Sequence, residues 1–352
     1  MKKPDRERLH YLDLLWRRRR IRAARASSKR QRLSIAKKRF TRPRRVRDLV
    51  SLSAPAEFSV QHSERRASLL RFLHRLTESL EGGSQVLINF DQTTTLSSGG
   101  TLLFVATIDK LLAKFPGRLA SNYPANSTIE QMFQHIGLLK KLGNSPRLSI
   151  TAENVKHWHF LCGETADLSG VKNLFNILAT QLSDDTSSGL FDSISEAVTN
   201  VVQHAYEGVE SSTESSSANN APPRWWLFAQ LKDMELQIAI CDLGIGIPKS
   251  LKEKAELTNI LPNIMRRLRK RKSSGMIEIA VESSRSRTKL PHRGKGLPDM
   301  LVFSRQAKIG GFLIYSHHGY FAYNAHFQSE TARDFYPPVG GTVICWQLPL
   351  SP

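Results

Sequence analysis

The sequence predicts an α/β protein with two folded domains that follow a basic N-terminal segment. The 352 residues leave room for two domains of ordinary size, and 40% of them are hydrophobic, as in folded rather than disordered proteins. Strand-like and helix-like stretches alternate over residues 57–147, which predicts a small α/β domain. Helices and strand-like stretches over residues 150–352 predict a second α/β domain with a mixed sheet.

The first 50 residues differ from the rest of the chain in charge. They contain 20 Lys/Arg and four Asp/Glu, a net charge of +16, whereas the whole chain carries +20. These 50 residues contain too few apolar side chains to form a core. We therefore expect a tail that is disordered or becomes helical only when its charge is neutralised. Such a tail is expected to bind an acidic partner, and nucleic acid, an anionic membrane and an acidic protein all fit. A solvated leader or an arm that docks on a partner is the alternative.

No segment of the sequence has the pattern of a membrane span. The most apolar run covers residues 100–108 and ends at Asp109, far short of the roughly 20 residues that a bilayer requires. No apolar region follows the basic start, so we expect no secretory signal. Cys162, Cys241 and Cys345 are isolated, which predicts neither a metal site nor a disulfide framework. We therefore expect a cytoplasmic protein.

Within the first domain, hydrophobic periodicity and turn residues define five elements in order. The helix at Glu64–Leu80 shows the clearest helical spacing, because its leucines share one broad face and Gly82-Gly83 ends it. The five predicted elements are a helix at Glu64–Leu80, a buried strand at Val86–Phe90, a helix from Ser97-Ser98 through Ala113, a strand around Arg118–Asn122 and a helix at Ser127–Leu142.

The second domain alternates less regularly. Residues 210–223 are polar and of low complexity, which predicts a flexible surface loop. Residues 252–288 are basic and mostly helical in pattern. The other predicted elements are strands at His157–Cys162, Trp225–Leu231, Leu236–Cys241, Ile309–Ser316, Phe321–Phe327 and Thr342–Leu348, and helices at Val171–Leu182 and Ser187–Tyr206.

The helix around Glu196 has two distinct faces. At 100° per residue, Glu196, Asn200 and His204 lie within about 80° of one another. The opposite face is apolar and is expected to pack on the sheet; it contains Leu190, Ile194, Val198, Val201 and Ala205. An ordinary amphipathic helix with a polar outer face is the alternative interpretation.

Three glycine-containing segments follow this helix at the ends of predicted elements. Asp242 ends a strand and is followed by Gly244 and Gly246, which allow the backbone to approach a ligand closely. Residues 294–297 (Gly294, Lys295, Gly296, Leu297) form a second segment whose bare N–H groups at a helix start suit an anion. Gly340-Gly341 then precedes Thr342, which opens the last predicted strand.

In this order and spacing, the four segments resemble the N, G1, G2 and Gly-Thr boxes of the GHKL superfamily of ATP-binding domains. The resemblance covers roughly residues 150–350 and implies an α/β sandwich with helices on one face of a mixed sheet. It implies ATP and Mg²⁺ as ligands. Asn200 would hold Mg²⁺, Glu196 would be the general base, and Asp242 would accept a hydrogen bond from the adenine amino group, with Thr342 near it. Residues Gly244, Gly246, Gly294, Lys295, Gly296 and Leu297 would line the nucleotide, the lid lying within residues 252–292.

The segment from Ser195 to Tyr206 is most similar to the N box of bacterial anti-sigma-factor serine kinases, which phosphorylate a serine on a small STAS-domain partner. The preceding domain, residues 57–147, itself weakly resembles a STAS domain, and matching the motif makes Ser98 the phosphoacceptor. Leu96 stands where that motif has an acidic residue, and Pro298 stands where a third G2 glycine is usual. Helix capping by Ser97 or Ser98 is the alternative role of these serines.

Three functions remain open at this point. The first is an ATP-dependent regulator that switches a protein partner by serine phosphorylation or by hydrolysis. The second is a nucleic-acid-associated ATPase whose basic tail binds DNA or RNA, and the third is a nucleotide-binding module without turnover. Glu196 favours chemistry over binding alone. GHKL domains often act as homodimers, which makes a second copy of the chain an expected partner.

Overall fold

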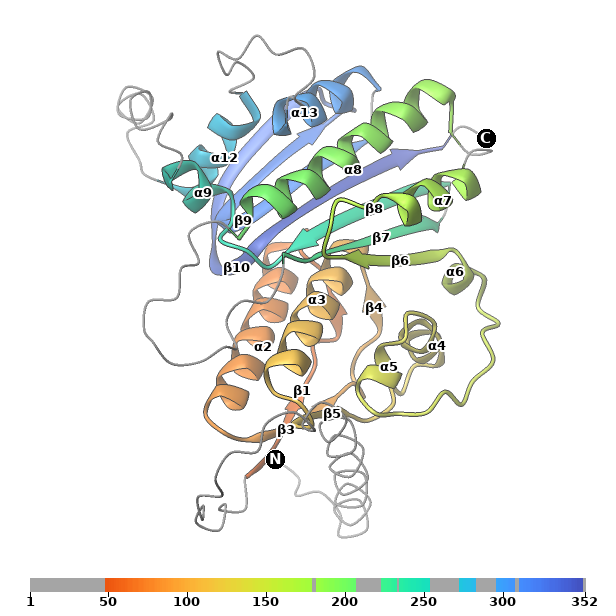
Figure 1. Ribbon diagram of the computed structural model, residues 1–352. Coiled ribbons are helices and arrows are strands. Elements are labelled where there is room, and N and C mark those ends of the chain that lie inside the picture. The colour runs from red at the N-terminus through yellow and green to blue at the C-terminus, as the bar shows by residue number, and fades with distance from the viewer. Residues whose placement is uncertain are drawn as a thin grey trace, which may run out of the picture. The chain divides into compact units, whose positions relative to one another are not determined.

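The computed structural model describes residues 48–178, 182–206, 223–232, 234–253, 272–282, 296–307 and 310–350 (Figure 1). These residues form an α/β structure with a parallel sheet and an antiparallel sheet. Residues 1–47 of the predicted 1–50 tail, all but the last residue of the predicted 210–223 loop, and most of the predicted 252–292 lid lie outside the described residues. The prediction is wrong for Leu49 and Val50, which the structure places in a strand. Within the described part of the chain, no helix is both long and apolar enough to cross a membrane.

The described chain divides into two compact units. The first contains residues 48–56, 72–95 and 108–150, and the second contains residues 57–71, 96–107 and the chain from 151 onward. Residues 57–71 and 96–107, which the sequence pattern assigns to the first domain, therefore group by their contacts with the second unit. Helices α2 (Ser63–Glu81) and α3 (Ser98–Lys114) contribute residues to both units, and the short strands β2 (Glu57–Phe58) and β4 (Thr95–Leu96) lie near the same boundaries.

The first unit is built on a parallel sheet of order β1-β3-β5. Its strands are β1 (Leu49–Ser53), β3 (Gln85–Asn89) and β5 (Leu119–Ser121). Strand β3 is central because it pairs with both β1 and β5. Its residues Val86 and Ile88 are fully buried, as the apolar run predicts. Strand β1 is not in the sequence prediction, because Leu52 is its one buried residue and the strand shows no hydrophobic run.

The prediction of one continuous helix at Ser127–Leu142 is wrong. The structure breaks it into α4 (Ser127–His135) and α5 (Leu138–Lys141), with Gly137 between them at φ 73°. This left-handed conformation ends a helix and is readily adopted by glycine. The N-terminus of α4 follows ordinary capping, since Asn126 Oδ1 accepts hydrogen bonds from the N–H groups of Thr128 and Ile129.

The second unit contains a five-element sheet of order β6-β7-β8-β10-β9. Each of its registered strand pairs is antiparallel, so the sheet is antiparallel rather than mixed as predicted. Short connections join β7 to β8 and β9 to β10, and short connections require antiparallel neighbours. The strands are β6 (Trp158–Gly163), β7 (Trp225–Lys232), β8 (Glu235–Asp242), β9 (Gly311–Asn324) and β10 (Ser329–Pro349).

Strand β9 doubles back on itself. The N–H of Ala325, just after the strand, donates to the carbonyl of Gly310, just before it. Fourteen extended residues would separate these ends by about 45 Å, so the strand must reverse. The reversal coincides with His317, whose φ is 55°. The first half then pairs with residues 342–347 of β10 and the second half with residues 329–334. The sequence pattern does not predict a strand at residues 329–334.

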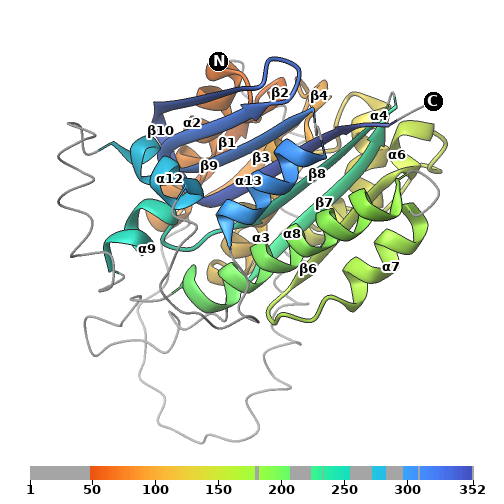
Figure 2. The same ribbon diagram turned by 90° about the horizontal axis from the view of Figure 1, so that it is seen from above.

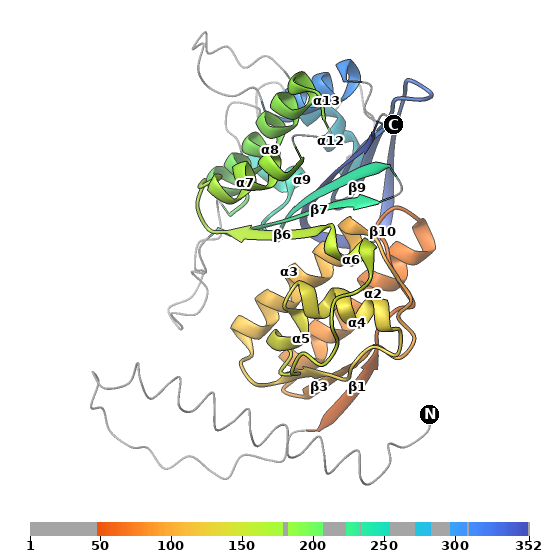
Figure 3. The same ribbon diagram turned by 90° about the vertical axis from the view of Figure 1, so that its right-hand side faces the viewer.

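Helices cover the face of the sheet that carries Ile238, Ile240 and Ile344. Figures 2 and 3 show α7, α8 and α13 lying along this face, and buried residues of all three helices belong to the same apolar core. The helices of this unit are α6 (Glu153–Lys156), α7 (Ser169–Leu178), α8 (Asp184–His204), α9 (Ile247–Glu253), α12 (Ser273–Glu282) and α13 (Leu297–Gln306).

The opposite face of the same sheet is also buried. Phe228, Ala239 and Cys345 are each less than 5% exposed there. Gly99, which belongs to the same unit, lies so near that a Cβ added to it would be 2.9 Å from Cys345 Sγ. Gly99 belongs to helix α3, so helices of this unit lie against both faces of the sheet rather than against one face as predicted.

Candidate functional site

Helix α8 presents Glu196 and Asn200 away from the core. Leu190, Ile194 and Val198 are fully buried, whereas Glu196 and Asn200 are half-buried on the other side of the helix. The predicted two-faced helix is thus confirmed. Within the described residues, the Asn200 side chain makes no hydrogen bond, so its amide oxygen remains available as a ligand.

Asp242 and Thr342 lie side by side at the ends of two neighbouring strands. Asp242 ends β8 directly opposite Thr342 of β10, and Thr342 is directly opposite Ser316 of β9. Residues opposite each other in adjacent strands project from the same face, so these three side chains form a row. The row is buried, with exposed fractions of 5%, 7% and 0% for Asp242, Thr342 and Ser316.

The segment after Asp242 is pressed against the end of α8. The N–H of Gly244 donates to Asp242 Oδ1 at 2.8 Å, and the N–H of Ile245 donates to Ala205 O at 2.7 Å. A Cβ on Gly244 would lie 1.9 Å from Ala205 O, so this approach requires glycine. Gly246, at φ 76°, continues the turn toward α9. The predicted N-box helix and G1 loop are therefore in direct backbone contact.

The start of α13 brings a third predicted segment to α8. Gly296 occupies the cap position of α13, and a Cβ on it would lie 3.8 Å from Glu196 Oε1. Leu297 begins the helix and Pro298 occupies its first turn, where a missing N–H costs no helical hydrogen bond. The proline that departs from the usual glycine pattern is therefore compatible with a helix start. Gly294 and Lys295 lie outside the described residues.

The Glu196 carboxyl lies in a setting that favours proton uptake. Burial raises its pKa above the ordinary glutamate value, and the nearby Asp299 carboxylate raises it further. His204 acts in the opposite direction and lowers the pKa. A carboxylate with a raised pKa is a better proton acceptor than an exposed one, which suits a general base.

Ser97 and Ser98 have different environments at the start of α3. Ser97 Oγ accepts a hydrogen bond from the N–H of Gly100 at 3.3 Å and donates to Phe58 O at 2.8 Å, so it caps the helix. Ser98 is 5% exposed, and its Oγ donates to Gln237 Oε1 at 3.3 Å within the second unit. Phosphorylation of Ser98 would require this contact to open.

Two residues of this region were not predicted from the sequence as site residues. Tyr206 donates its O–H to Arg224 O at 3.0 Å and accepts the N–H of Leu243 at 3.4 Å, which ties the end of α8 to the Asp242 strand. Burial, together with the Asp242 carboxylate, raises the pKa of Tyr206 to about 12. Ser316 is the other residue; no motif marks it, because its contacts come from segments distant in sequence.

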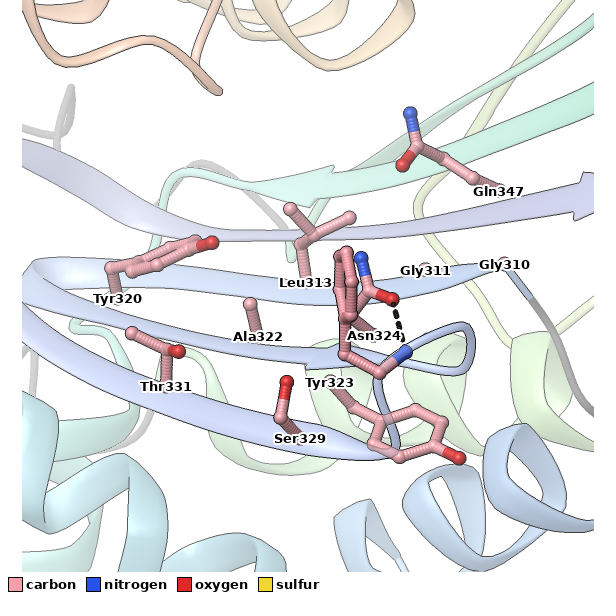
Figure 4. Close-up of a pocket in the computed structure, with 11 residues that line it drawn as sticks. Gly310, Gly311, Leu313, Tyr320, Ala322, Tyr323, Asn324, Ser329, Thr331 and Gln347 are labelled. Atoms are coloured by element: carbon pink, nitrogen blue, oxygen red, sulfur yellow. Dashed lines mark hydrogen bonds between the residues drawn. The ribbon is translucent and has the colours of Figure 1, made fainter.

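A separate hollow of about 280 Å³ lies over the doubled part of β9 (Figure 4). Its floor includes Gly311 and Ala322, with Leu313 and Gln347 beside them. Leu313 and Gln347 alternate with Ile314 and Trp346 along their strands, so they face away from the helix-covered core and from Asp242. The hollow is therefore distinct from the predicted nucleotide site.

A scan against protein-family models finds no match, and a search of curated proteins finds no relative. In the part of the chain that the structure describes, no group of three or more His, Cys, Asp or Glu side chains has the arrangement of a metal site.

Proposed function

We propose that the second unit binds Mg-ATP as a GHKL-type domain and uses it for phosphoryl transfer or hydrolysis that switches a protein partner. One observation carries the proposal: contacts link residues of four separate segments in pairs, at Glu196 and Ala205 in and just after the second half of α8 and between strands β8 and β10. Gly244 packs on Ala205, Asp242 pairs with Thr342, and Gly296 lies beside Glu196. Each of these contacts joins motifs that the sequence separates by roughly 40 to 100 residues.

In this proposal the adenine base enters beside Asp242, whose carboxylate accepts a hydrogen bond from the exocyclic amino group. Asn200 would hold Mg²⁺, since an amide oxygen is a suitable ligand for a hard cation. The backbone at Gly296 and the start of α13 would face the phosphates. Mg²⁺ supplies charge neutralisation of the transferred phosphoryl group.

Glu196 is the general base of the proposed reaction. It removes the proton of an attacking water or serine hydroxyl, and its raised pKa supports this assignment. The parallel sheet of the first unit supports a STAS-like module. Because Ser98 is buried against Gln237, a serine on a partner protein is the more accessible acceptor in this arrangement.

The test is to incubate the full chain with γ-labelled ATP and Mg²⁺ and to follow the label. Label on protein supports a kinase, and free phosphate supports a hydrolase. ATP binding without label transfer would leave only the nucleotide-binding part of the proposal, and absence of ATP binding by calorimetry would refute it. Mass spectrometry with the Glu196→Gln chain as control determines whether Ser98 is modified.

A further inference from the structure

Ser316 contacts three residues from two segments of the Asp242 region through one hydroxyl group. Its Oγ accepts the N–H of Ile247 at 2.9 Å and donates to the carbonyl of Gly341 at 3.0 Å. The Thr342 Oγ1 lies 3.1 Å away, and either hydroxyl could donate in that contact. Ser316 is fully buried, so water does not compete for these bonds.

The number of available protons determines the direction of the Ser316–Thr342 hydrogen bond. A serine hydroxyl has one proton and two acceptor positions. The Gly341 carbonyl can only accept, so it takes the Ser316 proton, and the Ile247 N–H can only donate, so it takes one acceptor position. The remaining acceptor position receives the Thr342 proton. Thr342 is therefore left with lone pairs and no proton for a ligand.

We infer that Ser316 is a positioning residue for base selectivity, because it makes Thr342 a hydrogen-bond acceptor beside the Asp242 carboxylate. This inference rests on the proposed ATP site. Two adjacent acceptors favour a base edge that carries an amino group with two protons, as the 6-position of adenine does. They disfavour a 6-oxo purine, whose oxygen would face two acceptors without a proton between them.

A positioning role for Ser316 and a purely structural role predict different changes in the selectivity for ATP over a 6-oxo nucleotide. Loss of the Ser316 hydroxyl would free the Thr342 proton to rotate toward the base and donate to a 6-oxo group. Ser316→Ala should therefore weaken the preference for ATP over inosine triphosphate, whose base carries a 6-oxo group and an N1 proton in place of the 6-amino group. A role in holding the loop alone would reduce the affinities for both nucleotides by the same factor.

The experiment measures dissociation constants of ATP and inosine triphosphate by calorimetry for the full wild-type chain, Ser316→Ala, Thr342→Val and the double variant. We expect the ratio of the two constants to fall at least about fivefold in each single variant. The double variant should match Thr342→Val alone, because Ser316 acts through Thr342. Ser304→Ala is the matched control: that serine is also fully buried, but its Oγ donates to Met300 O within α13.

The outcomes separate this inference from the proposed function. Failure of the wild-type chain to bind ATP refutes the proposed function. ATP binding with an unchanged ratio in Ser316→Ala, or additive effects in the double variant, overturns the role of Ser316 alone. If Ser316→Ala binds neither nucleotide, Thr342→Val decides, because an equal loss for both nucleotides overturns the assignment of Thr342 as an acceptor.

Discussion

Gly340 and Gly341 are adjacent glycines that provide an internally controlled test of the Asp242 region. A Cβ on Gly340 would meet no atom within 4 Å, whereas a Cβ on Gly341 would lie 2.2 Å from the carbonyl oxygen of Asp242. The atoms that Gly341→Ala would displace belong to the backbone, so no side chain can rotate to relieve the contact. Gly341 also has a φ of 82°, which disfavours alanine.

The two effects give an expected magnitude for Gly341→Ala. The left-handed conformation costs about 1–2 kcal/mol for a residue with a Cβ, and overpacking costs about 1–3 kcal/mol. The free energy of unfolding should therefore fall by roughly 2–5 kcal/mol, while Gly340→Ala should change it by no more than about 0.5 kcal/mol. For a unit of this size the midpoint of thermal unfolding would fall by about 4–20 °C.

Tryptophan fluorescence is a suitable assay, because Trp158, Trp225, Trp226 and Trp346 all lie in the second unit. Unfolding midpoints are compared with and without saturating Mg-ATP, since a ligand that binds the folded state raises the midpoint. Gly340→Ala should keep the ATP-dependent increase and Gly341→Ala should lose most of it, because Asp242 would be displaced. Equal midpoints for the two variants would refute the packing argument.

The remaining predictions concern the phosphate end of the proposed site and the basic tail. Asn200→Ala should bind ATP with an affinity that no longer depends on Mg²⁺, whereas the exposed Gln203→Ala on the same helix should retain the dependence; calorimetry with and without Mg²⁺ measures both. Glu196→Gln should retain ATP binding and lose about 10²–10⁴-fold in turnover. Because burial and Asp299 raise the pKa of Glu196, wild-type turnover should decline on acidification at a higher pH than an exposed glutamate would give, and a pH–rate profile without this acidic limb would contradict the assignment. A chain that begins at residue 48 should lose salt-sensitive binding to duplex DNA or RNA, which in the full chain should weaken by about three decades or more between 50 and 200 mM salt; retained binding by the truncated chain would move the interaction to residues 266–272.

Local periodicity predicted the elements that bury a regular face. The α8 helix is the clearest case, since a 3.6-residue period separated Ile194 and Val198 from Glu196 and Asn200, and burial follows that division. The same reasoning failed where one residue decides the backbone. Gly137 breaks the predicted helix at Ser127–Leu142, because its left-handed conformation ends α4.

Tertiary contacts explain what the sequence did not predict in the second unit. The reversal of β9 near His317 depends on pairing with two separate parts of β10, which no short window of sequence contains. Ser316 was predicted as the last residue of a strand, but its contacts with Ile247 and Gly341 come from segments about 70 and 25 residues away. Packing of these segments, rather than a local pattern, makes Ser316 a candidate site residue.

The two ends of the proposed site differ in what holds them in place. At the Asp242 end, sheet pairing and the backbone contacts of Gly244 and Gly341 fix the positions of the acceptors. At the Glu196 end, the side chains of Glu196 and Asn200 lie on the side of α8 that faces away from the core. Gly296, at the start of α13, has no side chain that could pack against its surroundings. Substitutions at Ser316 or Gly341 should therefore change affinity and base selectivity, whereas substitutions at Glu196 should change turnover with affinity retained. The proposed base binding and the proposed chemistry should therefore be separable by mutation, because different elements support Asp242 and Glu196.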